Sequence, residues 1–151
     1  MAAGSFDLRS PRDLLAKLHH DLRRLEAEPL DQYAAFDFFV TAWHMLDWID
    51  PGEDQTAKDR RKAIRDRSVI LKVCDHLASG SKHFQATAKR HDSVKATEHH
   101  RGAFSSGFSR GFDTSMLCVH LEGQAAVALG AMVEVVDLAR LTLAEIEGMV
   151  I

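Results

Sequence analysis

Apolar residues recur at helical spacing in several stretches of the chain. The first stretch follows residues 10–13 (Ser-Pro-Arg-Asp), a typical helix start in which serine caps, proline suits the first turn and aspartate complements the helix dipole. Leucines then follow one another three and four residues apart from Leu14 to Leu25, and Pro29 ends the stretch. The pattern predicts a first helix within residues 10–29.

Three further stretches predict the remaining helices. Residues 30–49 are apolar around most of a helical circumference, so we expect the central and most buried helix there. Residues 53–79 predict a third helix that breaks near Arg65 and is followed by Gly80 as the residue just beyond its end. From about Ala131 onward, apolar residues return at helical spacing and predict the last helix.

The segment between the third and last helices has a different pattern. Residues 85–115 show no sustained periodicity, so we expect a long loop, with irregular strands as the alternative. The run Met116–Leu121 predicts a short strand, Glu122-Gly123 a turn, and Gln124–Ala128 a return strand. The expected fold is therefore a mainly α single domain (1–151), a four-helix up-down bundle with a long charged insert (85–128) that contains a short β-hairpin before the last helix.

The chain is long enough, at 151 residues, to bury one core. No apolar run approaches the roughly 20 residues of a membrane span, and the first nine residues lack the apolar stretch of a secretory signal. Cys74 and Cys118 form no CxxC pair and are interpreted as reduced core residues. We therefore expect a cytoplasmic protein without a membrane partner.

The charged residues add a candidate binding surface, because the net charge of −3 hides an uneven distribution of charge along the chain. Residues 1–57 balance to −6, residues 58–101 to +7, and residues 102–151 to −4. Such a basic segment is typical of a surface for RNA or another polyanion, although a solvated helix face that binds nothing has the same composition. The candidate nucleic-acid-binding residues are Arg60, Arg61, Arg65, Arg67, Lys89, Arg90 and Arg101.

Phe104, Phe108 and Phe112 lie between glycines and serines in the same insert. They have the stacking groups that single-stranded nucleic acids use, or they fold back over the core. The sequence leaves both interpretations open.

A second candidate site combines two segments. Asp37, Thr41, His44 and Trp48 fall on one line of the second predicted helix, with Asp47 beside it, and a buried His–Asp pair can serve as a general base. Lys82 and His83 follow the third helix, where they either share a pocket with His44 or simply complement the helix C-terminus. The candidate catalytic residues are His44, Asp47, Lys82 and His83.

Metal and cofactor motifs are absent from the sequence. It contains nine histidines but no HExxH, paired CxxC or Glu-x-x-His pattern, and no phosphate loop or GxSxG. A three-ligand site built from His44, Asp47 and His83 stays open as an alternative, but we assign no metal site and no cofactor.

The layout of three helices, a charged insert and a last helix resembles HEPN-type bundles, small bacterial domains of toxin, phage-defence and RNA-processing systems. Many HEPN ribonucleases carry an arginine and a histidine with four to six residues between them, and two copies meet across a dimer. Arg12 and His19, with six residues between them, match this spacing, but in the first helix rather than a later one. The resemblance implies an RNA-directed role and a homodimer, without assigning Arg12 and His19 as catalysts.

The leading hypothesis is thus an intracellular HEPN-like protein that binds RNA or another polyanion through residues 58–101, with metal-independent ribonuclease activity as an extension. Two alternatives remain: a bundle that binds a small molecule or a metal, and a non-catalytic protein of a phage or toxin–antitoxin system that acts through a protein partner.

Overall fold

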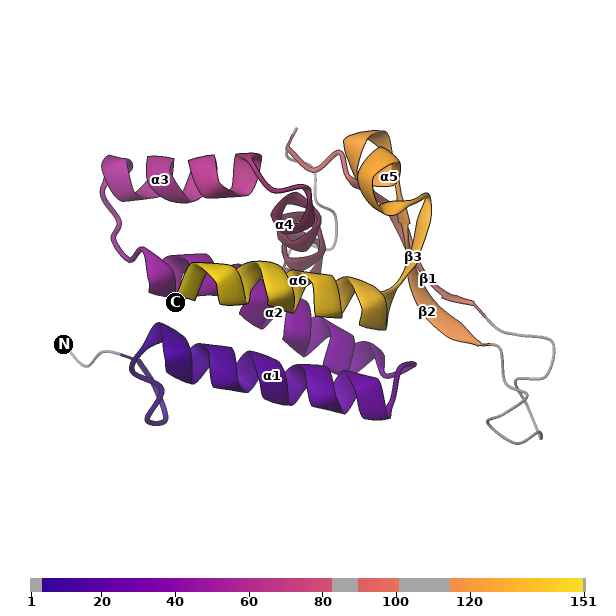
Figure 1. Ribbon diagram of the computed structural model, residues 1–151, viewed down its shortest axis with the longest axis horizontal. Helices are drawn as coiled ribbons and strands as arrows, with labels where there is room; N and C mark the ends of the chain where they lie inside the picture. The colour runs from indigo at the N-terminus through magenta and orange to yellow at the C-terminus, as the bar shows by residue number, and fades with distance from the viewer. Residues whose placement is uncertain (1–3, 83–89, 101–114, 151) are drawn as a thin grey trace.

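The computed structural model describes residues 4–82, 90–100 and 115–150. These residues form six helices and a three-stranded antiparallel sheet, so the expected mainly helical class is confirmed (Figure 1). The helices are α1 (Pro11–Ala27), α2 (Gln32–Ile49), α3 (Gln55–Asp66), α4 (Val69–Lys82), α5 (Gly123–Leu129) and α6 (Val135–Val150). The strands are β1 (Val94–His100), β2 (Met116–Leu121) and β3 (Met132–Glu134).

Helix α1 begins where the sequence predicts. The Ser10 side chain accepts a hydrogen bond from the Asp13 backbone N–H, and the Asp13 carboxylate accepts one from the Ser10 backbone N–H at 2.9 Å, which together form a capping box. The Arg9 backbone N–H donates to the same carboxylate and holds the pKa of Asp13 below its usual value. The leucine stripe of α1 is buried against the rest of the protein.

Helix α2 is the centre of the fold, as expected, because it packs against α1, α4 and α6. Phe38 and Met45 are fully buried on it. The rings of Phe38 and Phe39 meet edge to face, with centroids 5.1 Å apart. This edge-to-face contact stabilises the folded protein beyond the burial of the two rings.

The predicted break of the third helix is confirmed, since α3 ends at Asp66 and α4 begins at Val69. Ser68 starts the new helix by accepting a hydrogen bond from the Leu71 backbone N–H at 3.2 Å. Helix α4 runs on to Lys82, so the expectation that Gly80 lies beyond the helix end is wrong. A glycine inside a helix costs only about 1 kcal/mol, which the packing of α4 offsets.

The up-down four-helix arrangement is not confirmed. Figure 1 shows α4 nearly end on while α1, α2 and α6 extend across the view, so α4 crosses these helices. Helix α3 buries only Ala57 and stands at the opposite end of the view from the sheet. Helices α1, α2 and α6 therefore pack against one another, α4 crosses them, α3 lies at the periphery, and the short α5 packs beside α4 and the sheet.

The sheet has the strand order β1-β2-β3, and its middle strand β2 is the strand predicted at Met116–Leu121. The expected return strand at Gln124–Ala128 is wrong, because α5 occupies these residues and β1 and β3 pair with β2. Residues 94–100, expected within a loop, form β1, and the last helix starts at Val135 because β3 precedes it. The alanine-rich composition of residues 123–129 favours a helix over a strand.

One face of strand β2 packs against the core. Leu117, Val119 and Leu121 alternate along β2 and join the buried core. The pairing of β1 with β2 shifts by one residue between Val94 and Ala96, which is a β-bulge.

Candidate functional site

Carboxylates at the C-terminal end of α2 bind arginines of the basic helix α3. Arg60 binds both oxygens of Asp50, at 2.6 and 2.8 Å, and its hydrogen bonds hold the pKa of Asp50 below its usual value. Arg61 lies 3.3 Å from the Asp47 carboxylate and donates to the Asp50 carbonyl at 2.7 Å. Two of the predicted nucleic-acid-binding arginines therefore hold α3 against α2.

Two further predicted arginines meet at a buried carboxylate. Asp75, 1% exposed, accepts hydrogen bonds from Arg65 at 3.2 Å and from Arg90 at 2.9 Å. Arg65 also lies 2.6 Å from Asp66, whose pKa falls to about 2 because Lys62 and Arg65 donate to it. Carboxylates thus compensate much of the positive charge that the sequence concentrates in residues 58–67.

A small hollow lies between α2 and α3. Its volume is about 190 Å³. Its lining carries four cations and a single carboxylate, and two of the cations, Lys58 and Lys62, have side chains 51% and 65% exposed. The lining residues are Trp43, Leu46, Asp47, Lys58, Arg61, Lys62 and Arg65.

The predicted polar line on α2 does not form one site. His44 and Asp47 are exposed, and Asp47 pairs with Arg61, so the buried His44–Asp47 pair does not form. Thr41 is buried and accepts a hydrogen bond from Lys17, while Asp37 binds Arg24 at 2.9 Å. These contacts join α1 to α2 and are structural.

Other predicted residues are placed only in part. Lys82 is the last residue of α4, and its side chain is not described. His83, Lys89 and Arg101 lie outside the described residues, so the expected approach of His83 to His44 stays a prediction. Arg67 is exposed at the end of α3.

The arginine–histidine pair that carries the HEPN resemblance lies on α1. Arg12 is exposed, and the Nε2 atom of His19 lies 2.6 Å from a carboxylate oxygen of Glu147 on α6. The contact joins the first and last helices of the same chain.

Two histidines lie beside Asp75. The rings of His76 and His91 have centroids 5.1 Å apart, and the Val94 backbone N–H donates to the Nδ1 atom of His76 at 3.2 Å. Burial lowers the pKa of both histidines below the usual value, against the raising effect of Asp75. The Nδ1 atom of His91 is buried and has no hydrogen-bond partner among the described residues.

We expect the protein to lose stability as the pH falls below about 6.5, because the unfolded chain binds a proton at His76 more readily than the folded protein does. Protonation of Nδ1 also breaks the hydrogen bond from Val94. Urea unfolding between pH 5 and pH 8 measures the effect. His76→Asn retains an acceptor but does not titrate, so a pH dependence as steep as that of the wild type in this variant would contradict the prediction.

A larger hollow of about 690 Å³ lies between α2, α4 and the sheet. Its lining is mostly apolar and includes Phe36, Phe39 and Leu77, together with His76 and Lys95 as ionisable groups. A hollow of this size with few polar groups is typical of small-molecule sites.

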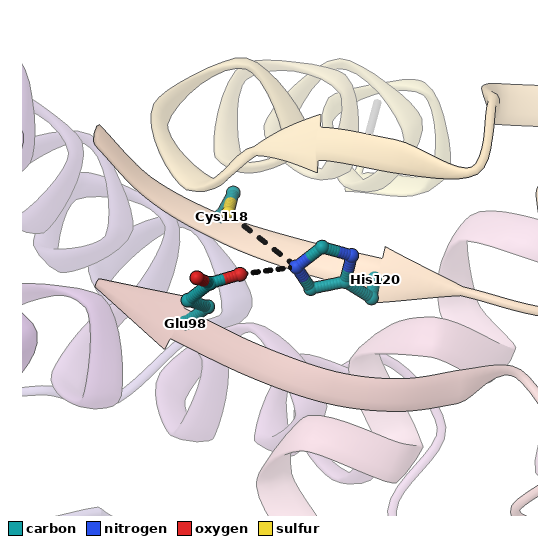
Figure 2. Close-up of side chains that lie close together, drawn as sticks. All are labelled: Glu98, Cys118 and His120. Carbon is teal, nitrogen blue, oxygen red and sulfur yellow. Dashed lines mark hydrogen bonds and ion pairs between the residues drawn. The ribbon is translucent and has the colours of Figure 1, made fainter. Parts of the chain in front are cut away.

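One group of side chains on the sheet combines the atoms that bind metals. Glu98, Cys118 and His120 place a carboxylate oxygen, a sulfur and an imidazole nitrogen within 4.8 Å of one another, as Figure 2 shows. The sequence alone does not identify this group. A cysteine and a histidine two residues apart in the predicted strand 116–121 were its only signal.

Comparison of the chain with protein-family models, curated proteins and solved structures finds no match. None of the helices that the structure describes has the length and apolar character needed to cross a bilayer. Functional inference therefore rests on the sites themselves.

Proposed function

We propose that this chain binds RNA or another phosphate polymer at the hollow between α2 and α3. The observation that carries the proposal is the lining of that hollow, in which four cations outnumber one carboxylate around Trp43. Cationic side chains bind phosphate oxygens, and an aromatic ring provides a stacking face for an unpaired base. The hollow has room for a phosphate group.

The exposed lysines are the part of this lining that is available to a ligand. Lys58 lies 3.8 Å from Glu53, and Lys62 lies 2.7 Å from Asp66, and all four side chains are at least 37% exposed. Ion pairs of this kind contribute about 0–1 kcal/mol and are screened by salt, so a phosphate can compete for these lysines. The side chains of Arg61 and Arg65 are only 13% and 11% exposed, and they line the buried side of the site.

The proposal predicts that Lys58→Ala/Lys62→Ala weakens the binding of a single-stranded RNA oligonucleotide. Loss of two phosphate contacts reduces the slope of log K against log salt by about 1.4, because each contact on a single strand contributes about 0.7. Fluorescence anisotropy over a range of salt concentrations measures this slope.

The matched control is Arg12→Ala/Arg23→Ala, which removes two exposed cations from α1 and leaves the hollow intact. We expect its salt slope to stay closer to that of the wild type than the slope of the lysine variant. Wild-type protein that binds no RNA, DNA or polyphosphate at low salt would refute the proposal, and equal losses in the two variants would refute the location of the site.

Cleavage of RNA is not part of the proposal. Metal-independent acid–base cleavage needs a proton acceptor and a proton donor. His44 is exposed on α2 beside Trp43, and the second predicted histidine, His83, lies outside the described residues. A HEPN-like relationship, a homodimer and a cytoplasmic location belong to the same proposal, and light scattering of purified protein tests the dimer.

The larger hollow favours a second candidate function, the binding of a mostly apolar small molecule between α2, α4 and the sheet. A ligand that binds the folded state raises the melting temperature. A thermal-shift screen of apolar carboxylates and aromatic compounds therefore tests it, with Phe36→Ala as the variant that alters the lining.

A further inference from the structure

Three side chains on β1 and β2 converge on one point (Figure 2). The Nε2 atom of His120 lies 2.6 Å from a carboxylate oxygen of Glu98 and 4.0 Å from the sulfur of Cys118. Cys118 is fully buried, whereas the side chains of His120 and Glu98 are 33% and 48% exposed. The group therefore has a buried side and a side open to solvent.

The geometry of the sheet explains the convergence. Cys118 and His120 are two residues apart on β2, so their side chains project from the same face. Glu98 lies directly opposite Cys118 on β1, which brings it onto this face too. Ala96 lies opposite His120, and its small side chain leaves space beside the imidazole ring.

The β-bulge determines which β1 residue joins the group. Val94 pairs with Leu121 and Ala96 pairs with His120, so β1 contains one extra residue there. If Lys95 paired with His120 instead and the register continued without the bulge, Glu98 would lie opposite Leu117 on the core face, because a slip of one position exchanges the two faces of a strand. Bulges commonly redirect side chains at functional sites in this way.

The arrangement does not match a cysteine–histidine–acid triad. In such a triad the acid binds one ring nitrogen and the nucleophile the other, so that the imidazole is oriented by the acid and accepts a proton from the thiol. Here the carboxylate and the thiol both face Nε2. Burial, together with the charges of Glu98 and Glu134, also raises the pKa of Cys118, which opposes thiolate formation without a cation.

We propose that Glu98, Cys118 and His120 form a binding site for a divalent transition-metal ion of the zinc class. Thiolate, imidazole and carboxylate together suit Zn²⁺, whereas Mg²⁺ and Ca²⁺ prefer oxygen ligands alone. The thiolate and the carboxylate together balance the two charges of the ion. Three protein ligands leave a fourth position for water or for Glu134, which pairs with Cys118 from the other side on β3.

The distances are close to those that a tetrahedral ion requires. With bond lengths of about 2.0–2.3 Å, the nitrogen and sulfur ligands lie about 3.6 Å apart and the nitrogen and oxygen ligands about 3.4 Å apart. The sulfur must therefore approach Nε2 slightly from 4.0 Å, and the carboxylate must retreat from its 2.6 Å contact. Side-chain rotations supply both movements.

Titration of the untagged full chain with Co²⁺, followed by competition with Zn²⁺, tests the proposal. We expect one ion per chain, with an absorption band from thiolate-to-cobalt charge transfer that Zn²⁺ removes. Cys118→Ser should remove the band. Glu98→Gln and His120→Asn should each weaken binding by about 100-fold, since even residues that only support metal ligands cost 10–100-fold.

Two controls separate this site from the other thiol and from the other histidines. Cys74→Ala removes the second cysteine, and His99→Gln changes an exposed histidine that pairs with Leu117 on the opposite face of β1. Both should bind as the wild type does. Absence of a charge-transfer band in the wild type, or a band that survives both Cys118→Ser and Glu98→Gln, would overturn the proposal, and the exposed Glu98 keeps the test decisive if Cys118→Ser does not fold.

Discussion

Replacing Phe38 with alanine is expected to lower the free energy of unfolding by about 3–5 kcal/mol. Phe38 is fully buried on α2, the helix that contacts α1, α4 and α6. The substitution removes its edge-to-face contact with Phe39 and leaves a cavity that these helices close only in part. Urea or guanidinium unfolding, monitored by circular dichroism, measures the change.

Phe36→Ala is the matched control, because Phe36 lies on the same helix and is 50% exposed. We expect a loss of less than about 1 kcal/mol, as for most exposed positions. Equal losses in the two variants would show that α2 is not the centre of the core.

Asp75→Ala should have an effect of similar size, about 3–5 kcal/mol, which is typical of a buried ion pair that loses one partner. Asp75 accepts hydrogen bonds from Arg65, Arg90 and Ser79. Removing it leaves Arg65, 11% exposed, without the carboxylate on its α4 side. Because Arg65 also lines the hollow beside α3, the variant should weaken polyanion binding as well as stability.

Asp59→Ala provides the comparison for Asp75. Asp59 is exposed on α3 and accepts a hydrogen bond from Gln55 at 2.8 Å. Removing a surface carboxylate costs at most about 0.5 kcal/mol. Chemical unfolding of both variants tests the difference, and an Asp75→Ala protein as stable as Asp59→Ala would show that the buried network does not hold α3 and α4 together.

The parts of the fold that depend on local sequence could be predicted. The capping residues Ser10 and Asp13 lie within the first turn of α1, and Ser68 at the α3–α4 break caps the helix that follows it. The apolar composition of residues 32–49 likewise predicts that α2 lies at the centre of the fold. In each case the residues that determine the structure are close together in the chain.

Strand β1 could not be predicted in the same way. Its sequence, Val-Lys-Ala-Thr-Glu-His-His, lacks alternating apolar residues, since β1 is an edge strand and residues 95–99 are exposed. Its pairing with β2 joins residues that are 16 to 27 positions apart in the chain, and the periodicity of a local stretch does not reveal such a pairing. The same limit explains why the prediction of a return strand at 124–128 is wrong, because β2 pairs with β1 and β3 instead.

The basic candidate residues illustrate a related limit. The sequence identifies Arg60, Arg61 and Arg65 as cations, but each of them binds a carboxylate that lies ten or more residues away, on or beside another helix. Only the tertiary structure shows that Asp50 and Asp75 compensate their charge and that Lys58 and Lys62 remain the exposed cations of the hollow.

The β-bulge between Val94 and Ala96 also bears on how this chain can evolve. The metal-binding group depends on the number of residues between Ala96 and Glu98, and not on whether a residue occupies position 95. A substitution or loss of Lys95 leaves Glu98 opposite Cys118, whereas an insertion or deletion of one residue between Ala96 and Glu98 turns the carboxylate toward the core. Among descendants of this chain, a change of length between Ala96 and Glu98 would therefore separate those that retain the group from those that have lost it.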